Sequence, residues 1–444
     1  MQYENLSQEL VDRCLSKGAD SAEVLIEEGR QLSIEVRNGE METIQESSSH
    51  GAGFRVFRQG KMGFAHSNDI SDASLETAIE SAVNFAQHMT ADEHNILPTD
   101  PGITEVEGLF DPGMAAVSMD DKIAMITDLE RLAMADSRIT VSNGAGYGEG
   151  EGSVYLANSN GLAKSYRSSA CNYGVSVVAE KGEQKSSGGE YCSRRLFSDL
   201  VSPEEVAEKA ARSAFEMLDP QMVETQRAPV IFDPDVARSL LGGILGAING
   251  ERVLQGASFL ADSVGKKVAS DLLTVVDDGT RPKGLASSPF DGEGVPTQRR
   301  TIIDGGVLQG FMYNTAVASR AGVQSTGNAA RGGFSSLPGI GPHAFYVEAG
   351  ETDPEEIIRS TPNGLYVKGV TGYGINPVSG DFSGGAQGFW IQNGRLAFPV
   401  MGLTVAASAD EMLNGIDMLG SDLDLTRTMT APTFRIREMQ IGGL

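Results

Sequence analysis

The sequence predicts an α+β fold of two domains, with antiparallel or mixed β-sheets, packed helices and a glycine-rich, β-rich C-terminal domain. At 444 residues, the chain is longer than one hydrophobic core usually organises. It also contains 54 glycines and repeated two-residue turn sequences. Both features favour antiparallel sheets with a few packed helices over a doubly wound α/β sheet.

The first half reads as a helix followed by long hairpins. A helical apolar pattern over residues 6–15 ends at Gly18. Strand-like sequence follows and is joined at Asn38-Gly39, the pair that a type I′ turn requires. Two more helices are predicted over residues 72–89 and about 119–136, before hairpin sequence resumes around Asn160-Gly161.

A boundary between the domains is predicted near residue 222. A helix begins at Ser202-Pro203, where serine is a good cap and proline suits the first turn. Residues 218–229 then carry no periodic pattern and read as a linker. We therefore expect domains at residues 1–222 and 223–444, the second with hairpins at Asp304-Gly305 and Asn393-Gly394.

The composition limits the partners and the compartment. The chain has 35 basic and 60 acidic residues, a net charge of −25, which opposes direct binding to nucleic acid. No apolar run approaches the roughly 18–20 residues that a membrane span needs, and the N-terminus does not resemble a signal peptide. Three widely spaced cysteines indicate reduced thiols, so we expect a cytoplasmic protein with no membrane association.

The most informative segment is the predicted helix within residues 232–251. Asp233 is a good N-cap, Pro234 suits the first helical position, and Asn249-Gly250 is expected to end the helix. Three small residues interrupt its apolar stripe: Gly242, Gly243 and Gly246. Each glycine costs about 1 kcal/mol relative to alanine, so we expect another backbone to approach closely there. A phosphate-binding loop is rejected because the glycines lie inside a helix and no Gly-Lys-Ser/Thr follows.

The surroundings of this helix resemble the TldD/PmbA family of metalloprotease-related proteins, and most closely its PmbA/TldE-type subunits. The resemblance rests on the helix frame and on residues 257–280, which end in the VVDDGT run. Residues 300–322 and 372–406 resemble further blocks of the same family. The N-terminal half matches in layout.

The resemblance implies that this chain lacks the family's zinc site. TldD-type peptidases carry HExxxH on this helix, with two histidines on zinc and the glutamate as general base. Those positions correspond here to Gly242, Gly243 and Ala247, none of which has a donor side chain. The C-terminal cysteine ligand of TldD-type subunits is also missing, because no cysteine follows Cys192.

By resemblance we therefore expect a non-catalytic pseudoenzyme subunit that binds no zinc itself. It would pair with a zinc-bearing TldD-type paralogue as a heterodimer, or form a homodimer in isolation. It would shape a cavity for extended peptide substrates during proteolysis. Family members are tied to peptide-antibiotic maturation, antitoxin turnover and an old label as modulators of DNA gyrase. Two alternatives stay open: an active peptidase or hydrolase with an unrecognised site, and a peptide-binding scaffold without a peptidase partner.

Other polar residues are weaker candidates for a site. Asn314, Asn376, Ser379 and Asp381 lie near the ends of predicted strands and are predicted to contact an extended peptide added to a sheet edge. His343 is the only histidine of the second domain and is considered for a meeting with Asp381 or Asp304.

Overall fold

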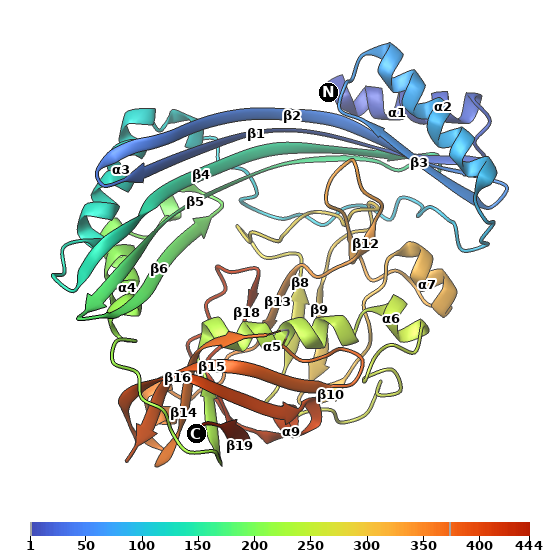
Figure 1. The fold of residues 1–444 in the computed structure, drawn as a ribbon. Helices are drawn as coiled ribbons and strands as arrows, with labels where there is room; N and C mark the ends of the chain where they lie inside the picture. The colour runs from blue at the N-terminus through green and yellow to red at the C-terminus, as the bar shows by residue number, and fades with distance from the viewer. Residues whose placement is uncertain (1, 373) are drawn as a thin grey trace.

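The computed structural model describes residues 2–372 and 374–444, and its first half builds one long, curved antiparallel sheet (Figure 1). The strands lie in the order β3-β2-β1-β4-β5-β6. Four of them have 17–20 residues, which gives the sheet its arched length. In chain order they are β1 (Ser21–Arg37), β2 (Glu40–Arg58), β3 (Lys61–Ser67), β4 (Ile139–Asn158), β5 (Ala163–Lys181) and β6 (Gln184–Arg194).

Two pairs of helices pack on opposite ends of this sheet (Figure 1). The first pair, α1 (Gln2–Ser16) and α2 (Asp72–His88), forms one apolar core with β1 and β2. The second pair, α3 (Met119–Ala133) and α4 (Pro203–Phe215), forms another core with β4, β5 and β6. The sheet therefore has two separate cores, one at each end.

The second half contains two mixed sheets around a larger core. One has the order β10-β9-β8-β13-β18 and the other β16-β15-β14-β7-β19-β17, with a further β16–β19 pairing. The strands of the first sheet are β8 (Val275–Asp278), β9 (Arg299–Asp304), β10 (Val307–Leu308), β13 (Ala344–Val347) and β18 (Met429–Thr430). Those of the second are β7 (Gln226–Phe232), β14 (Asn363–Thr371), β15 (Asp381–Gln392), β16 (Arg395–Ser408), β17 (Ile416–Leu419) and β19 (Phe434–Gly442). A separate two-stranded ribbon pairs β11 (Ala329–Ala330) with β12 (Gly339–Ile340).

Helix α5 (Pro234–Ala247) packs on the second half, on the side that faces the arched sheet (Figure 1). Four short helices complete this half: α6 (Gly250–Leu254), α7 (Thr315–Ala321), α8 (Pro354–Arg359) and α9 (Ala409–Gly415). The parallel pairs β14–β7 and β13–β18 make both sheets mixed. The α+β class with antiparallel and mixed sheets is confirmed.

The predicted turns are confirmed in part. Asn38-Gly39 and Asn393-Gly394 join neighbouring strands, and all four residues have positive φ. The prediction at Asp304-Gly305 is wrong by one residue. Asp304 is the last residue of β9 and pairs with Val307, so Gly305 and Gly306 form the turn, with φ of 50° and 80°. Glycine at both positions allows this left-handed backbone.

Each sheet takes all of its strands from one side of residue 222, the predicted boundary. The arched sheet takes its strands from residues 21–194, and the other sheets take theirs from residues 226–442. Residue 222 lies between α4 and β7. Among the helices that the structure describes, none combines the length and the apolar character needed to cross a bilayer.

Candidate functional site

Helix α5 begins where the sequence predicts. The Asp233 side chain accepts a hydrogen bond from the backbone N–H of Asp235 at 3.0 Å, and Pro234 occupies the first helical position. The expected end at Asn249-Gly250 needs a correction. Asn249 caps the short helix α6 by accepting from the backbone N–H groups of Glu251 and Arg252, so the chain continues into a second helix.

The glycines of α5 have different surroundings. A Cβ at Gly243 would lie 2.4 Å from Ile375 Cβ and 2.6 Å from its carbonyl oxygen. A Cβ at Gly246 would lie 2.8 Å from Pro377 Cβ. The predicted close approach of another backbone is thus confirmed at Gly243, whereas Gly246 is approached by the side chain of Pro377. The prediction is wrong at Gly242, which is exposed and where a Cβ would meet no atom of the described residues within 4 Å.

A polar cleft lies between the two halves at the N-terminal end of α5. Its volume is about 840 Å³. One wall is made by β6 residues 185–190 and by α4, and the other by the start of α5 and strands β14 to β16. A second cavity of about 320 Å³ shares Glu190, Lys209 and Arg427 with it. The edge strand of the arched sheet therefore faces the second half across a space large enough for a peptide segment.

Arg427 bridges the two walls of this cleft. Its Nη1 lies 2.6 Å from Asp235 Oδ1 on α5, and its Nη2 lies 3.9 Å from Glu190 Oε1 on β6. The guanidinium also lies over the Tyr191 ring, 5.4 Å from its centroid. Burial raises the pKa of Glu190 above its ordinary value, although Arg427 opposes the shift. One arginine thus links carboxylates from both halves.

A second charged group lies at the base of α5. The Tyr366 hydroxyl donates to Asp233 Oδ2 at 2.9 Å, and Lys368 Nζ lies 3.7 Å from the same oxygen. Lys368 also lies 3.9 Å from Glu216, which follows α4. Burial and the nearby Asp233 carboxylate raise the pKa of Tyr366. The carboxylate that caps α5 therefore also belongs to the wall of the cleft.

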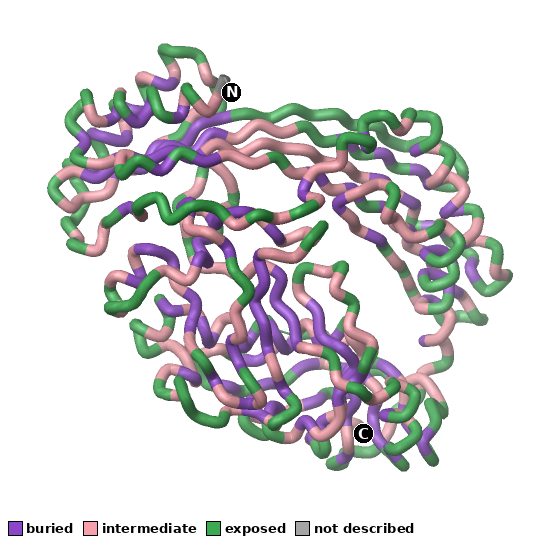
Figure 2. Tube along the Cα trace, turned by 180° about the vertical axis from the view of Figure 1, so that it is seen from behind, coloured by how far each residue is buried: buried purple, intermediate pink, exposed green. Residues whose placement is uncertain are grey.

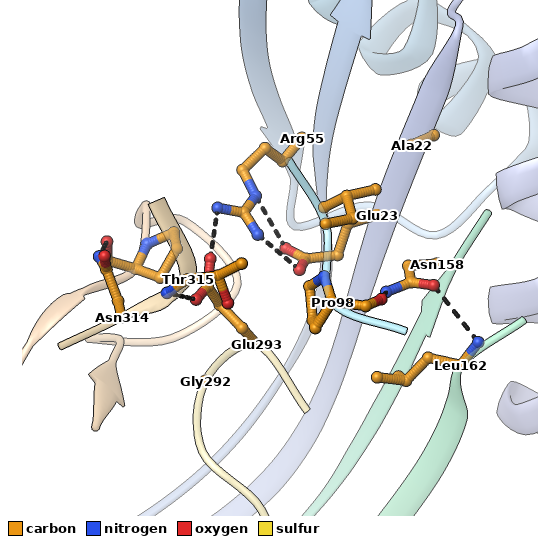
Figure 3. Close-up of polar contacts among 12 residues, drawn as sticks. Ala22, Glu23, Arg55, Pro98, Asn158, Leu162, Gly292, Glu293, Asn314 and Thr315 are labelled. Carbon is orange, nitrogen blue, oxygen red and sulfur yellow. Dashed lines mark hydrogen bonds and ion pairs between the residues drawn. The ribbon is translucent and has the colours of Figure 1, made fainter. Parts of the chain in front are cut away.

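Elsewhere the halves are joined by a buried ionic cluster (Figure 3). Arg55 of β2 donates to Glu23 of β1 at 2.7 and 3.1 Å and to Glu293 of the second half at 2.8 Å. Arg331 also pairs with Glu23, and the backbone N–H of Thr315 donates to Glu293 at 2.8 Å. Burial by itself would raise the pKa of Glu23, but Arg331 and Arg55 hold it below its ordinary value. The cluster fixes the arched sheet to the second half.

Comparison with known proteins identifies the family. PmbA/TldA metallopeptidase models match domain 1 at residues 22–86, the central domain at 114–218 and the C-terminal domain at 225–443. The metalloprotease PmbA of Escherichia coli O157:H7 is 32% identical over 432 residues, which is 96% of this chain and 93% of the relative. The chain belongs to the PmbA/TldD metallopeptidase family. A PmbA homologue from Haemophilus influenzae is 30% identical over 431 residues, with 96% and 93% coverage.

Solved structures of similar proteins share the whole PmbA/TldD fold. A Bacteroides thetaiotaomicron protein named for modulation of DNA gyrase has a TM-score of 0.91 and 28% identity, covering 100% of this chain and 99% of its own. TldE from Thermococcus kodakarensis has a TM-score of 0.90 at 24% identity, with 98% and 99% coverage. The resemblance inferred from the sequence is confirmed.

The three positions that the resemblance assigns to the family's zinc motif, Gly242, Gly243 and Ala247, carry no side chain that could bind a metal. Gly242 and Gly243 offer no side-chain donor, and Ala247 is fully buried. The space beside Gly243 is taken by Ile375. Within residues 2–372 and 374–444, no three His, Cys, Asp or Glu side chains are grouped so that they could hold a metal ion.

The four predicted peptide contacts hold their own loops in the structure. Asn314 caps α7, accepting from Val317 at 2.9 Å, and donates to the Pro338 carbonyl at 3.2 Å. Asn376 accepts from the backbone N–H groups of Val378 and Ser379. Ser379 in turn accepts from the N–H of Asp381, which opens β15 and is exposed. Contact of these residues with a peptide stays a prediction.

His343 has partners other than those considered from the sequence. Its backbone N–H donates to buried Asp277 at 2.7 Å, and its Nε2 lies 2.7 Å from the Gly327 carbonyl oxygen. In place of the considered meeting with Asp304 or Asp381, His343 contacts strand β8 through Asp277 and the loop that contains Gly327. The cleft residues Arg427, Tyr366 and Lys368 were missed by sequence reasoning, because each comes from a separate segment with no motif of its own.

Proposed function

We propose that this chain is a non-catalytic, peptide-binding subunit of a cytoplasmic zinc peptidase, whose metal is carried by a TldD-type paralogue. The observation that carries the proposal is that α5 has no donor side chains at the motif positions and is covered by another part of the chain. The helix keeps the family frame, but the motif positions have no donor groups, and the chain's own Ile375 fills the space beside Gly243. A helix closed in this way is suited to packing and not to hydrolysis.

The cleft beside α5 supports a role in holding peptide. It is lined by a sheet edge strand and by charged side chains of both signs, so it offers backbone groups and polar anchors to an extended chain. Arg427 and Lys368 each lie near one carboxylate at the start of α5 and near one carboxylate of the first half. A peptide carboxylate or acidic side chain could compete for either cation. The three described cysteines are free and buried, which supports a reducing compartment.

The test combines metal analysis with reconstitution. The purified chain alone is expected to contain far less than one zinc per chain and to leave an unstructured test peptide intact. Added to a zinc-bearing TldD-type paralogue, it is expected to form a stable heteromer and to increase cleavage of the same peptide. A stoichiometric zinc content with cleavage by this chain alone would overturn the proposal. Failure of the two chains to associate at micromolar concentration would also overturn it.

A matched pair of variants addresses the cleft. Lys368→Met is expected to weaken peptide binding to the heteromer by several-fold, because it removes a cation from the cleft wall. Lys267→Met serves as the control, because Lys267 is an exposed lysine that pairs with Asp271 outside the cleft. Equal effects of both substitutions would argue against the cleft as the peptide site.

A further inference from the structure

The arched sheet has a long unpaired edge at the first half of β2. Residues Glu40 to His50 pair with β1 on one side, from Arg37↔Glu40 to Glu28↔His50. On the other side, β3 covers only Ala52 to Arg58. Along these eleven consecutive residues, the outer backbone N–H and C=O groups of β2 pair with no strand in the described part of the chain. At about 3.4 Å per residue this edge is roughly 35 Å long.

This open segment is also uncovered on both faces. All residues from Glu40 to His50 are exposed, and Figure 2 shows them as a continuous exposed run along the outer strand of the arch. Met41 and Ile44 are 54% and 42% exposed. Ile44 lies opposite the fully buried Ile34 of β1, so the apolar side of the sheet continues to the rim. An edge of this length with exposed apolar side chains is suited to pairing with another chain.

The usual protections of a sheet edge are mostly missing here. The segment contains no proline, no lysine and no glycine, and its register irregularity lies near the tip, at Glu35/Val36. Its charges are all acidic: Glu40, Glu42 and Glu46. Arg37 and Arg30 of β1 approach two of them, at 3.5 Å from Glu42 and 2.9 Å from Glu46. The strand itself brings three carboxylates and no cation to the edge.

We infer that this edge accepts, by β-addition, an extended strand of a partner protein with basic side chains. The acidic side chains of this edge favour a basic partner strand over a second copy of this chain. A copy carries a net charge of −25 and the same three carboxylates. Antiparallel self-pairing centred on Ile44 would place Glu42 directly opposite Glu46, and like charges opposed across strands are destabilising. A basic strand forms the same backbone bonds and adds opposite-charge pairs.

The inference is independent of the proposed peptide cleft. The cleft is lined by β6, and β6 lies at the other end of the strand order from β2 and β3. A ligand in the cleft and a strand on β2 therefore use opposite edges of one sheet.

The test uses the full-length chain and two fluorescent ten-residue peptides of alternating sequence. One alternates lysine with threonine and valine, and the other has glutamate in place of every lysine. Fluorescence anisotropy is expected to give at least ten-fold tighter binding of the basic peptide, weakening with added salt. The variant Glu40→Lys, Glu42→Lys, Glu46→Lys is expected to reverse the preference. The control Glu93→Lys, Glu183→Lys, Glu355→Lys changes the net charge by the same amount at exposed sites outside this edge. This control is expected to keep the preference for the basic peptide.

Two proline variants test whether pairing occurs at the backbone. Neighbouring N–H groups of a strand point to opposite edges, so one of Thr43→Pro and Ile44→Pro blocks the open edge while the other breaks a bond to β1. The proline variant whose melting temperature is unchanged is expected to lose binding of the basic peptide. Equal binding of both peptides, or binding retained in both proline variants, would overturn the inference. So would self-association of the chain that the same proline abolishes, because the occupant would then be a second copy.

Discussion

Gly243 of α5 lies directly against Ile375, so that a Cβ at position 243 would come within 2.6 Å of the Ile375 carbonyl oxygen. Contacts this short to backbone cannot be relieved by a side-chain rotation. The neighbouring Gly242 differs, because a Cβ there would meet no atom within 4 Å among the residues that the structure describes. The pair gives a direct experimental comparison.

Alanine at the two positions is expected to act in opposite directions. Gly243→Ala forces the Ile375 loop away and should lower the free energy of unfolding by about 1–3 kcal/mol. Gly242→Ala enters open space and should raise it by up to about 1 kcal/mol, because alanine is the better helix former. Chemical denaturation of both variants measures this. Equal changes would show that the Ile375 contact does not govern the helix.

Rebuilding the peptidase motif is expected to fail for the same reason. The variant Gly242→His, Gly243→Glu, Ala247→His should be destabilised by a few kcal/mol, since two of the three sites are tightly packed. It should bind no stoichiometric zinc by elemental analysis. A stable variant that takes up zinc would mean that the Ile375–Pro377 loop moves aside and that a metal-sized pocket is retained.

The buried cluster is expected to be sensitive to the loss of a single partner. Arg55→Ala leaves Glu23 and Glu293 without their shared cation, and both are at most 1% exposed. Breaking a buried pair in this way costs about 3–5 kcal/mol. Arg30→Ala is the control, because its pair with Glu46 is more than half exposed and should matter little. If Arg55→Ala unfolds in two separate thermal transitions, the two halves no longer unfold together, which would show that the cluster couples them.

Asp291 predicts a pH dependence of stability. Burial and the neighbouring Glu293 raise its pKa from 3.8 to about 7, despite three backbone N–H groups that donate to it. The folded state then binds this proton more tightly than the unfolded state does. The contribution of protonated Asp291 to the free energy of unfolding is therefore full below about pH 4 and is lost as the pH rises to about 7. Asp291→Asn should lack this component. Urea unfolding across that pH range should give a flatter curve for the variant, and parallel curves would contradict the assignment.

The loop that covers the helix depends on Asn376. Its side chain accepts from the N–H groups of Val378 and Ser379, and Asn376 itself lies between Ile375 and Pro377, the residues that cover Gly243 and Gly246. Asn376→Ala should lower stability by about 1 kcal/mol, whereas Asn376→Asp keeps the acceptor and should be nearly neutral. Peptide binding measured on both variants separates this local role from the predicted contact. Loss of binding in Asn376→Asp without loss of stability would favour contact.

The sequence by itself determined the features that depend on a few neighbouring residues. Asn38-Gly39 and Asn393-Gly394 form turns because their left-handed backbone is a local preference, and Asp233-Pro234 starts α5 because cap and first turn are local as well. The absence of a donor side chain at Gly242, Gly243 and Ala247 was equally visible, since glycine and alanine offer no metal ligand in any fold.

Only the tertiary structure decided which groups from distant segments meet. Gly242 and Gly243 are neighbouring glycines that the sequence does not distinguish. In the structure, the loop that contains Ile375 packs on Gly243 and does not contact Gly242 among the described residues. Arg55 and Glu293 are separated by 238 positions and meet because the arched sheet docks on the second half. The cleft that Arg427 spans has the same origin. Contacts of this kind are set by how whole sheets pack, and no local pattern in the chain encodes that packing.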